Sequence, residues 1–131
     1  MICENVWTNG CFDVLHMGHI KLLNFAKSLG KTLTVGIDSD QRIKNNKSPD
    51  RPINTADERA EFLYNLKCVD KVVIFDSDTE LENYLRNLNI ETMVIGDDYI
   101  GKTVVGQGLV KQVIFFPKIP NKSSSLIINK L

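Results

Sequence analysis

The chain has 131 residues, of which 43% are hydrophobic and 24% are charged, and its 16 basic residues balance its 16 acidic ones. This length suits one domain with a core of its own, and the composition excludes a disordered or low-complexity chain, so we expect residues 1–131 to form a single domain. A formal net charge of zero excludes the broad basic face that draws proteins onto nucleic acid or anionic membranes, so any anion site must be local.

The first half of the chain alternates between strand and helix patterns. Residues 6–8 form a short β-rich run, and apolar residues then recur at helical spacing over residues 20–29, with Gly30 as the C-terminal stop. A second strand is predicted over residues 32–37. Residues 41–54 are basic, polar and broken by prolines, which predicts a mobile surface loop long enough to carry function.

The alternation continues after this segment. Thr55 and Glu58 have the spacing of a capping box, which predicts a helix that begins after Thr55. Residues 71–75 form a short, nearly continuous apolar run, which is typical of a strand covered on both faces. The next helix is predicted to begin at Asp78 or Thr79.

The remaining elements complete the fold prediction. Two more strands are predicted over residues 92–96 and 112–116, and Ser123 or Ser124 is suited to cap a last helix. Strands that alternate with helices indicate right-handed βαβ units. We therefore predict an α/β fold with a doubly wound, mostly parallel five-stranded sheet and helices on both faces. Ligands of such sheets bind beyond the carboxyl ends of the strands.

The sequence also constrains the compartment and the cysteine chemistry. No apolar run approaches the roughly 20 residues of a membrane span, and the chain begins with an acidic rather than a basic stretch. We expect a cytoplasmic protein that binds neither membrane nor nucleic acid. Cys3, Cys11 and Cys68 are odd in number and lack CxxC spacing, so neither a disulfide framework nor a zinc site is predicted.

The most informative stretch is residues 16–19, His-Met-Gly-His, which follows residues 8–13, Thr-Asn-Gly-Cys-Phe-Asp. Together they have the pattern of a strand, a tight glycine-bearing turn and a helix start. A helix N-terminus presents unpaired backbone N–H groups and a partial positive charge, so it attracts anions. Two imidazoles at that position add donors that stabilise charge on a phosphate under attack. The stretch therefore predicts a phosphate site.

This H-x-G-H pattern after a G-C-F-D turn resembles the signature of the nucleotidyltransferase superfamily with a Rossmann-like fold, which includes cytidylyltransferases and pantetheine-phosphate adenylyltransferase. Two groups within the superfamily are similar over essentially the whole chain. Resemblance to the domain that adenylylates heptose 1-phosphate rests on residues 8–13, Asp40, residues 51–54 and residues 68–70. Resemblance to glycerol-3-phosphate cytidylyltransferase rests on the short length, residues 19–23, residues 96–99 and residues 101–102.

The resemblance implies an enzyme that joins a phosphorylated polyol or sugar, such as glycerol 3-phosphate, to a nucleoside monophosphate taken from a nucleoside triphosphate, with release of pyrophosphate. The Asp97-Asp98 pair slightly favours CTP over ATP. The alternatives are a heptose 1-phosphate adenylyltransferase that uses ATP and a nucleotide-binding module without turnover. The resemblance also implies Mg²⁺ with the triphosphate, although the sequence does not name its ligands, and a homodimer.

Site residues follow from the same resemblance. The catalytic residues implied are His16, His19, Lys47 and Arg59. The nucleotide-binding residues implied are Thr8, Asn9, Gly10, Cys11, Phe12, Gly18, Gly96, Asp97, Asp98, Ser123, Ser124 and Ser125. The acceptor-binding residues implied are Asp13, Asp40 and Lys118.

Several of these assignments have alternatives. Lys44 competes with Lys47 as the lysine of the basic segment, and Arg59 is otherwise a charge on a helix surface. Asp13 either touches substrate or fixes its turn by accepting backbone N–H bonds.

The segment 118–125 departs from the R-T-E-G-I-S-T-T run of the cytidylyltransferases. It retains hydroxyls at a predicted helix start but lacks the arginine, the acid and the glycine, so the anion-binding helix end is kept without the bidentate arginine. Dinucleotide-dependent redox chemistry is disfavoured because no G-x-G-x-x-G follows the first strand.

Overall fold

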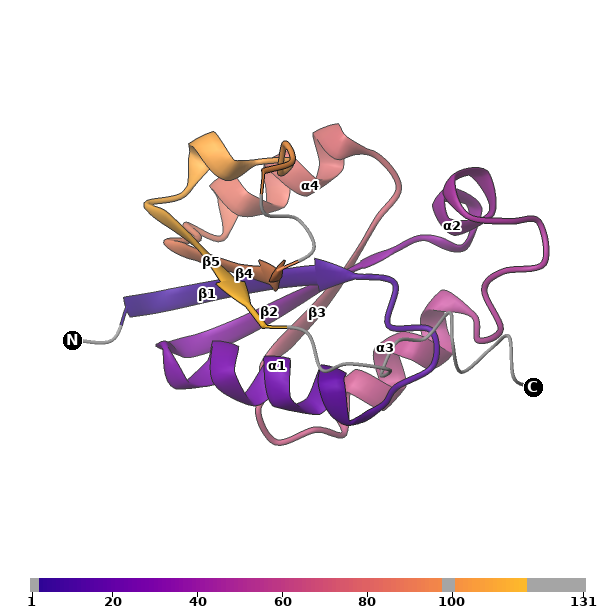
Figure 1. Ribbon diagram of the computed structural model, residues 1–131, viewed down its shortest axis with the longest axis horizontal. Helices are drawn as coiled ribbons and strands as arrows, with labels where there is room; N and C mark the ends of the chain where they lie inside the picture. The colour runs from indigo at the N-terminus through magenta and orange to yellow at the C-terminus, as the bar shows by residue number, and fades with distance from the viewer. Residues whose placement is uncertain (1–2, 98–100, 118–131) are drawn as a thin grey trace.

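The computed structural model describes residues 3–97 and 101–117 (Figure 1). Its elements in chain order are β1 (Cys3–Gly10), α1 (Met17–Ser28), β2 (Gly30–Asp38), α2 (Asp40–Asn46), α3 (Ala56–Tyr64), β3 (Lys71–Phe75), α4 (Asp78–Asn87), β4 (Thr92–Gly96), the 3₁₀ helix η2 (Gln107–Leu109) and β5 (Gln112–Phe116). The five strands form one sheet in the order β3-β2-β1-β4-β5, and every neighbouring pair is parallel. The predicted Rossmann-like, doubly wound fold is confirmed.

Helices cover both faces of this sheet, and each face has its own apolar core. In Figure 1, α1 and α3 lie below the sheet, whereas α4 and η2 lie above it. Strand residues alternate between the two cores, as the pleat of a strand requires. Val6 and Val94 pack in the cluster under α1 and α3, whereas their neighbours Trp7 and Met93 pack in the cluster under α4.

A close approach between β1 and β2 shapes the core under α4. Leu33, Val35 and Ile37 of β2 belong to the opposite cluster, so Gly36 faces α4. The indole of Trp7 covers this glycine, and a Cβ on Gly36 would lie 2.3 Å from Cζ2 of the indole. The buried indole therefore requires glycine at this position.

The segment predicted as a loop from residue 41 begins instead with the short helix α2. The hydroxyl of Ser39 accepts the backbone N–H of Arg42 at 3.1 Å and caps the helix, and Ile43 is buried. The prediction was wrong over residues 41–46 because one buried residue in a basic, polar segment produces no apolar periodicity.

Two further predictions need correction. The strand over residues 71–75 is present as β3, but it lies at an edge of the sheet and only Phe75 is buried, so it is not covered on both faces. The hydroxyl of Tyr64 hydrogen-bonds to the backbone N–H and C=O of Val72 at 3.2 and 3.3 Å, which occupies part of that edge. Gly30 begins β2 rather than ending the helix, and Leu29 in the right-handed helical conformation forms the cap.

The other elements agree with the sequence patterns. Thr55 and Glu58 form the predicted capping box of α3. Ser77 caps α4, which begins at Asp78. The last predicted helix, beginning near Ser123, lies outside the described residues. Within residues 3–97 and 101–117, no helix has the length and apolar character needed to cross a membrane.

The packing of Trp7 on Gly36 predicts that Gly36→Ala lowers the free energy of unfolding by about 2 kcal/mol, because the added methyl group forces a shift in a filled core. Urea denaturation followed by fluorescence of Trp7, the single tryptophan of the chain, measures the effect. Gly108→Ala is the matched control, since a Cβ there meets no atom within 4 Å. Equal midpoints for the two variants would contradict the packing argument.

Candidate active site

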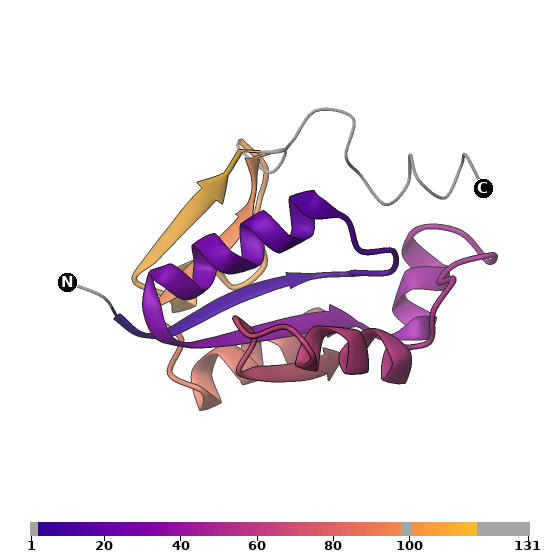
Figure 2. The same cartoon turned by 90° about the horizontal axis from the view of Figure 1, so that it is seen from below.

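The two halves of the sheet separate at their carboxyl ends. The register between β1 and β4 ends at Trp7↔Met93, whereas β1 stays paired with β2 as far as Gly10 and β4 stays paired with β5 as far as Gly96. Figure 2 shows β4 and β5 running away from β1. The strand order also reverses here, because the chain builds outward from β1 on one side and from β4 on the other. This is the point at which doubly wound sheets bind ligands.

A tight turn at the end of β1 leads into α1. Phe12 adopts a left-handed backbone conformation, with φ of 49°, and its side chain is buried. Its ring lies against Gly10, where a Cβ would approach Cε2 of the ring to 3.2 Å. The same ring lies beside the imidazole of His19, with 5.2 Å between ring centroids. The glycine and the aromatic residue of the motif therefore set the position of this histidine.

His16 and His19 cap the N-terminus of α1 with their side chains. Nδ1 of His16 accepts the backbone N–H of Gly18 at 3.0 Å, and Nδ1 of His19 accepts the backbone N–H of His16 at 3.2 Å. A neutral imidazole that accepts at Nδ1 carries its proton at Nε2. The ring centroids lie 4.0 Å apart, so two Nε2–H donors are held together at a helix end that has no acidic residue in its first turn.

Asp13 fastens the turn to the segment that precedes α3. Its carboxylate is fully buried and accepts the backbone N–H groups of Ile53 and Asn54 at 2.8 and 2.9 Å. The side-chain amide of Asn54 donates back to the carbonyl of Asp13 at 2.6 Å. Of the two roles considered for Asp13, the structure displays the one that fixes the backbone. Contact with an acceptor is not displayed and remains a prediction.

Arg59 lies inside the protein with 0% exposure. Its guanidinium donates to the carbonyls of Cys11, Asp38 and Asn54 at 2.9, 2.8 and 3.0 Å. It also forms an ion pair of 2.7 Å with Asp40, which the sequence assigned to the acceptor. Four of its five N–H donors are thus used within the protein, so Arg59 is not a surface charge, and its predicted contact with a phosphate stays a prediction.

A charged corner forms where β1 and β2 end. The thiol of Cys11 donates to the carboxylate of Asp38 at 3.8 Å. Burial, reinforced by the negative charge of Asp38, raises the pKa of Cys11 to about 11. Burial also raises the pKa of Asp38, against the opposing charge of Arg42.

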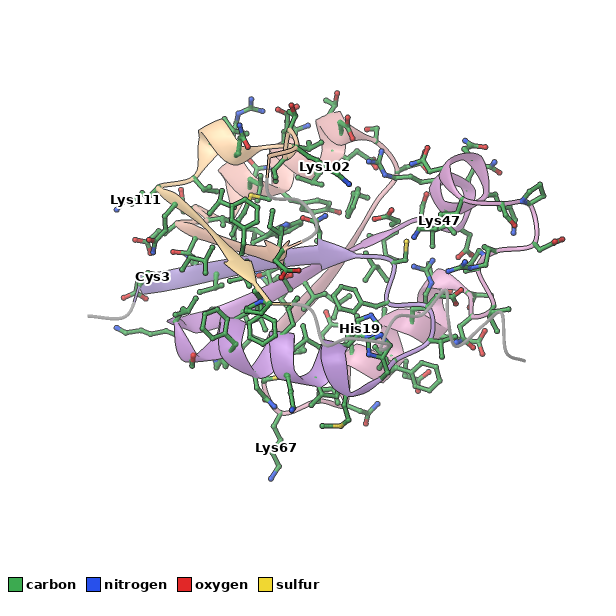
Figure 3. All side chains as sticks on the ribbon, viewed as in Figure 1. Cys3, His19, Lys47, Lys67, Lys102 and Lys111 are labelled. Carbon is green, nitrogen blue, oxygen red and sulfur yellow. The ribbon has the colours of Figure 1, made fainter. Side chains whose placement is uncertain are left out.

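The charge of Lys47 acts on both Cys11 and Asp38, which places its ammonium at this corner, and Figure 3 shows Lys47 beside α2. The competing residue Lys44 donates instead to the carbonyl of Arg51 at 3.3 Å. The structure thus favours Lys47 over Lys44 as the lysine at the site, and its role in catalysis remains a prediction.

The other predicted residues fall into two sets. Thr8 is buried in β1, and the side chain of Asn9 accepts the indole N–H of Trp7 at 2.8 Å. Gly96 ends β4 on the far side of the separation, and Asp97 follows it. The residues outside the described part of the chain are Asp98, Lys118, Ser123, Ser124 and Ser125.

Sequence reasoning assigned no role to Arg42 or Arg51, which the fold brings to this end of the sheet. Only the likeness of residues 51–54 to the heptose enzymes was a signal for Arg51.

Comparison with known proteins establishes the family. A model described as cytidylyltransferase-like matches residues 7–130. The chain belongs to the cytidylyltransferase-like family. The resemblance inferred from the H-x-G-H motif is therefore confirmed at the level of the family.

Individual relatives of this cytidylyltransferase-like chain are bacterial proteins. It is 47% identical over 126 residues to the bifunctional protein HldE of Campylobacter fetus, an alignment that covers 96% of this chain and 27% of HldE. For HldE of Helicobacter hepaticus the identity is 45%, over 96% of this chain and 26% of that protein. The chain therefore spans about a quarter of the length of these relatives.

A solved structure is also similar. The crystal structure of the lipopolysaccharide core biosynthesis protein from Thermoplasma volcanium superposes with a TM-score of 0.69 and 26% sequence identity. The match covers 88% of this chain and 98% of that protein. It supports the fold of this chain.

The buried thiol predicts a loss of stability at alkaline pH. Between pH 9.0 and about 11 the thiol of Cys11 ionises in the unfolded chain but stays protonated in the folded one, so stability falls as pH rises through this window. The loss is on the order of 2 kcal/mol. Cys11→Ser lacks a group that titrates there, so its urea stability should fall less between pH 8 and pH 11 than that of the wild type. Equal losses would contradict the assigned pKa.

Proposed function

We propose that this cytidylyltransferase-like domain transfers a nucleoside monophosphate from a nucleoside triphosphate to a phosphorylated sugar or polyol and releases pyrophosphate. The observation that carries the proposal is the pair of imidazoles held at the N-terminus of α1, where β1 and β4 separate. A helix end with two added N–H donors suits the phosphates of a nucleotide.

The reaction needs little covalent chemistry from the protein. A phosphate oxygen of the acceptor attacks the α-phosphorus, a new P–O bond forms, and the bond to the β-phosphate breaks so that pyrophosphate leaves with its electron pair. The enzyme has to align the reactants and stabilise the charge that develops on the α-phosphate and the leaving group. The Nε2–H groups of His16 and His19 and the ammonium of Lys47 are suited to that stabilisation.

ATP with a heptose 1-phosphate is the substrate pair that the relatives favour. The HldE proteins align with 96% of the chain, and residues 51–54 and 68–70 carry the likeness to the heptose enzymes. CTP with glycerol 3-phosphate is the second candidate, favoured by the Asp97-Asp98 pair and by the description of the matched family.

Mg²⁺ belongs to this proposal as part of the substrate. In the described residues no group of three or more His, Cys, Asp or Glu side chains is placed to hold a metal ion. Two carboxylates near the site are already paired, Asp13 with backbone N–H groups and Asp40 with Arg59. These residues do not fit a resident metal site. The ion would enter bound to the triphosphate, as Mg²⁺ commonly does.

A pyrophosphate-release assay tests the function. ATP and CTP are each paired with heptose 1-phosphate and with glycerol 3-phosphate, and we expect steady release for one pair at least. Calorimetric titration with each nucleotide runs in parallel. Nucleotide binding without release for these pairs and a wider panel of sugar and polyol phosphates would favour a binding module and contradict the enzyme proposal.

The two functions of His16 can be separated by choice of substitution. His16→Asn keeps a side-chain oxygen that accepts the N–H of Gly18, whereas His16→Ala removes the cap and lowers the free energy of unfolding by about 1 kcal/mol. Both variants lose the Nε2–H donor, so we expect turnover to fall at least about a hundredfold in each. Wild-type turnover by the stable Asn variant would remove His16 from the mechanism.

A further inference from the structure

Two arginines at the carboxyl end of the sheet differ in what their guanidinium groups contact. Arg59 is completely buried and donates four hydrogen bonds to protein oxygens. Arg51 is 13% exposed, and its Nε is buried without a hydrogen bond. Among the described residues, the terminal amino groups of Arg51 form no hydrogen bond either. The N–H donors of the Arg51 guanidinium are therefore available to a ligand, whereas four of the N–H donors of Arg59 are already used.

Arg51 is held beside the motif that forms the phosphate site. Its Nε lies 3.5 Å from a carboxylate oxygen of Asp13, which ends the turn after β1. Its positive charge also lowers the pKa of Cys11, against the larger effect of burial, so the guanidinium is near that thiol. Both neighbours lie in the turn between β1 and His16, and Arg51 itself lies in the segment between α2 and α3.

Hydrogen bonds hold the backbone around Arg51 in place, so the position from which its side chain extends is fixed. Its N–H donates to the carbonyl of Ser48 at 3.1 Å, and its own carbonyl accepts the ammonium of Lys44 at 3.3 Å. The next residues are held by Asp13 through the N–H groups of Ile53 and Asn54. A side chain with a buried stem on a fixed backbone loses little entropy when it binds a ligand.

Asp13 lies beside Nε of the Arg51 guanidinium but accepts no hydrogen bond from it. Both oxygens of that carboxylate already accept backbone N–H groups, and the distance to Nε is longer than a hydrogen bond. The attraction is therefore one of charge, and it leaves the fork of terminal N–H groups to other partners. A planar fork of this kind matches two oxygens of one phosphate group.

We propose that Arg51 is a substrate-binding residue whose guanidinium contacts phosphate oxygens during the reaction. The inference rests on the proposed nucleotidyl transfer and deepens it, because it identifies a phosphate ligand that the H-x-G-H motif does not contain. The phosphate belongs either to the nucleotide or to the acceptor, and the two sources share the same recognition chemistry.

The test compares Arg51→Gln and Arg51→Lys with the wild-type chain in the pyrophosphate-release assay, with each substrate varied in turn. Loss of a charged hydrogen bond to phosphate predicts that Arg51→Gln raises one KM at least about tenfold. A rise for the nucleotide identifies the triphosphate, and a rise for the acceptor identifies its phosphate. Arg51→Lys recovers part of the loss, because it keeps the charge but not the fork.

Arg86→Gln is the matched control, since Arg86 lies on the surface of α4 and its guanidinium donates to Asn83 at 3.3 Å. It should leave both KM values unchanged. Thermal melting accompanies each variant, and Arg51→Lys carries the test if Arg51→Gln fails to fold. Wild-type KM and kcat in the folded Arg51 variants would overturn the inference.

The outcome is distinguishable from failure of the proposed function. If wild-type protein turns over and the Arg51 variants match it, only this inference fails. If wild-type protein binds nucleotide without turnover, calorimetry with ATP, CTP, pyrophosphate and each phosphorylated acceptor supplies the readout, and Kd values that are unchanged for all of them in Arg51→Gln overturn the inference. If wild-type protein neither turns over nor binds ATP, CTP or pyrophosphate, the proposed function and this inference fail together.

Discussion

The buried guanidinium of Arg59 is the constraint around which this end of the protein is built. A charge removed from water must be paired and hydrogen-bonded, or it destabilises the fold by several kcal/mol. Arg59 meets that requirement by gathering the carbonyls of Cys11, Asp38 and Asn54 and the carboxylate of Asp40 around one planar group. The turns after β1 and β2 and the segment before α3 therefore cannot move independently. They form a rigid frame around the proposed phosphate site.

The two histidines of the motif have a structural function that also suits them to the proposed chemistry. Their Nδ1 atoms cap α1, and this use directs the proton of each neutral ring to Nε2. The cap therefore sets the tautomer that a phosphate-binding donor requires. Beyond Trp7↔Met93, β1 and β4 are no longer paired. The sheet is open at that point, which is where doubly wound sheets bind their ligands.

Much of the fold could be predicted because its signals are local. The β-rich runs at residues 71–75, 92–96 and 112–116 coincide with β3, β4 and β5, and the capping box at Thr55 begins α3. Helix α2 was not predicted because its one buried residue, Ile43, has only polar neighbours in the sequence of the helix. The mistaken burial of β3 has a different cause, since an edge strand and a central strand can have the same apolar run and differ only in their neighbours.

The sequence by itself determined the family and pointed to the proposed phosphate site, because the H-x-G-H motif and its turn are contiguous and their chemistry is local. It could not determine which charged residues face a ligand. Arg59 and Arg51 are both arginines near the start of α3, and only the tertiary structure buries one behind four hydrogen bonds and leaves the terminal amino groups of the other unbonded among the described residues. The reason is physical: the partners of Arg59 come from segments as far apart as Cys11 and Asn54, and no spacing along the chain encodes their convergence.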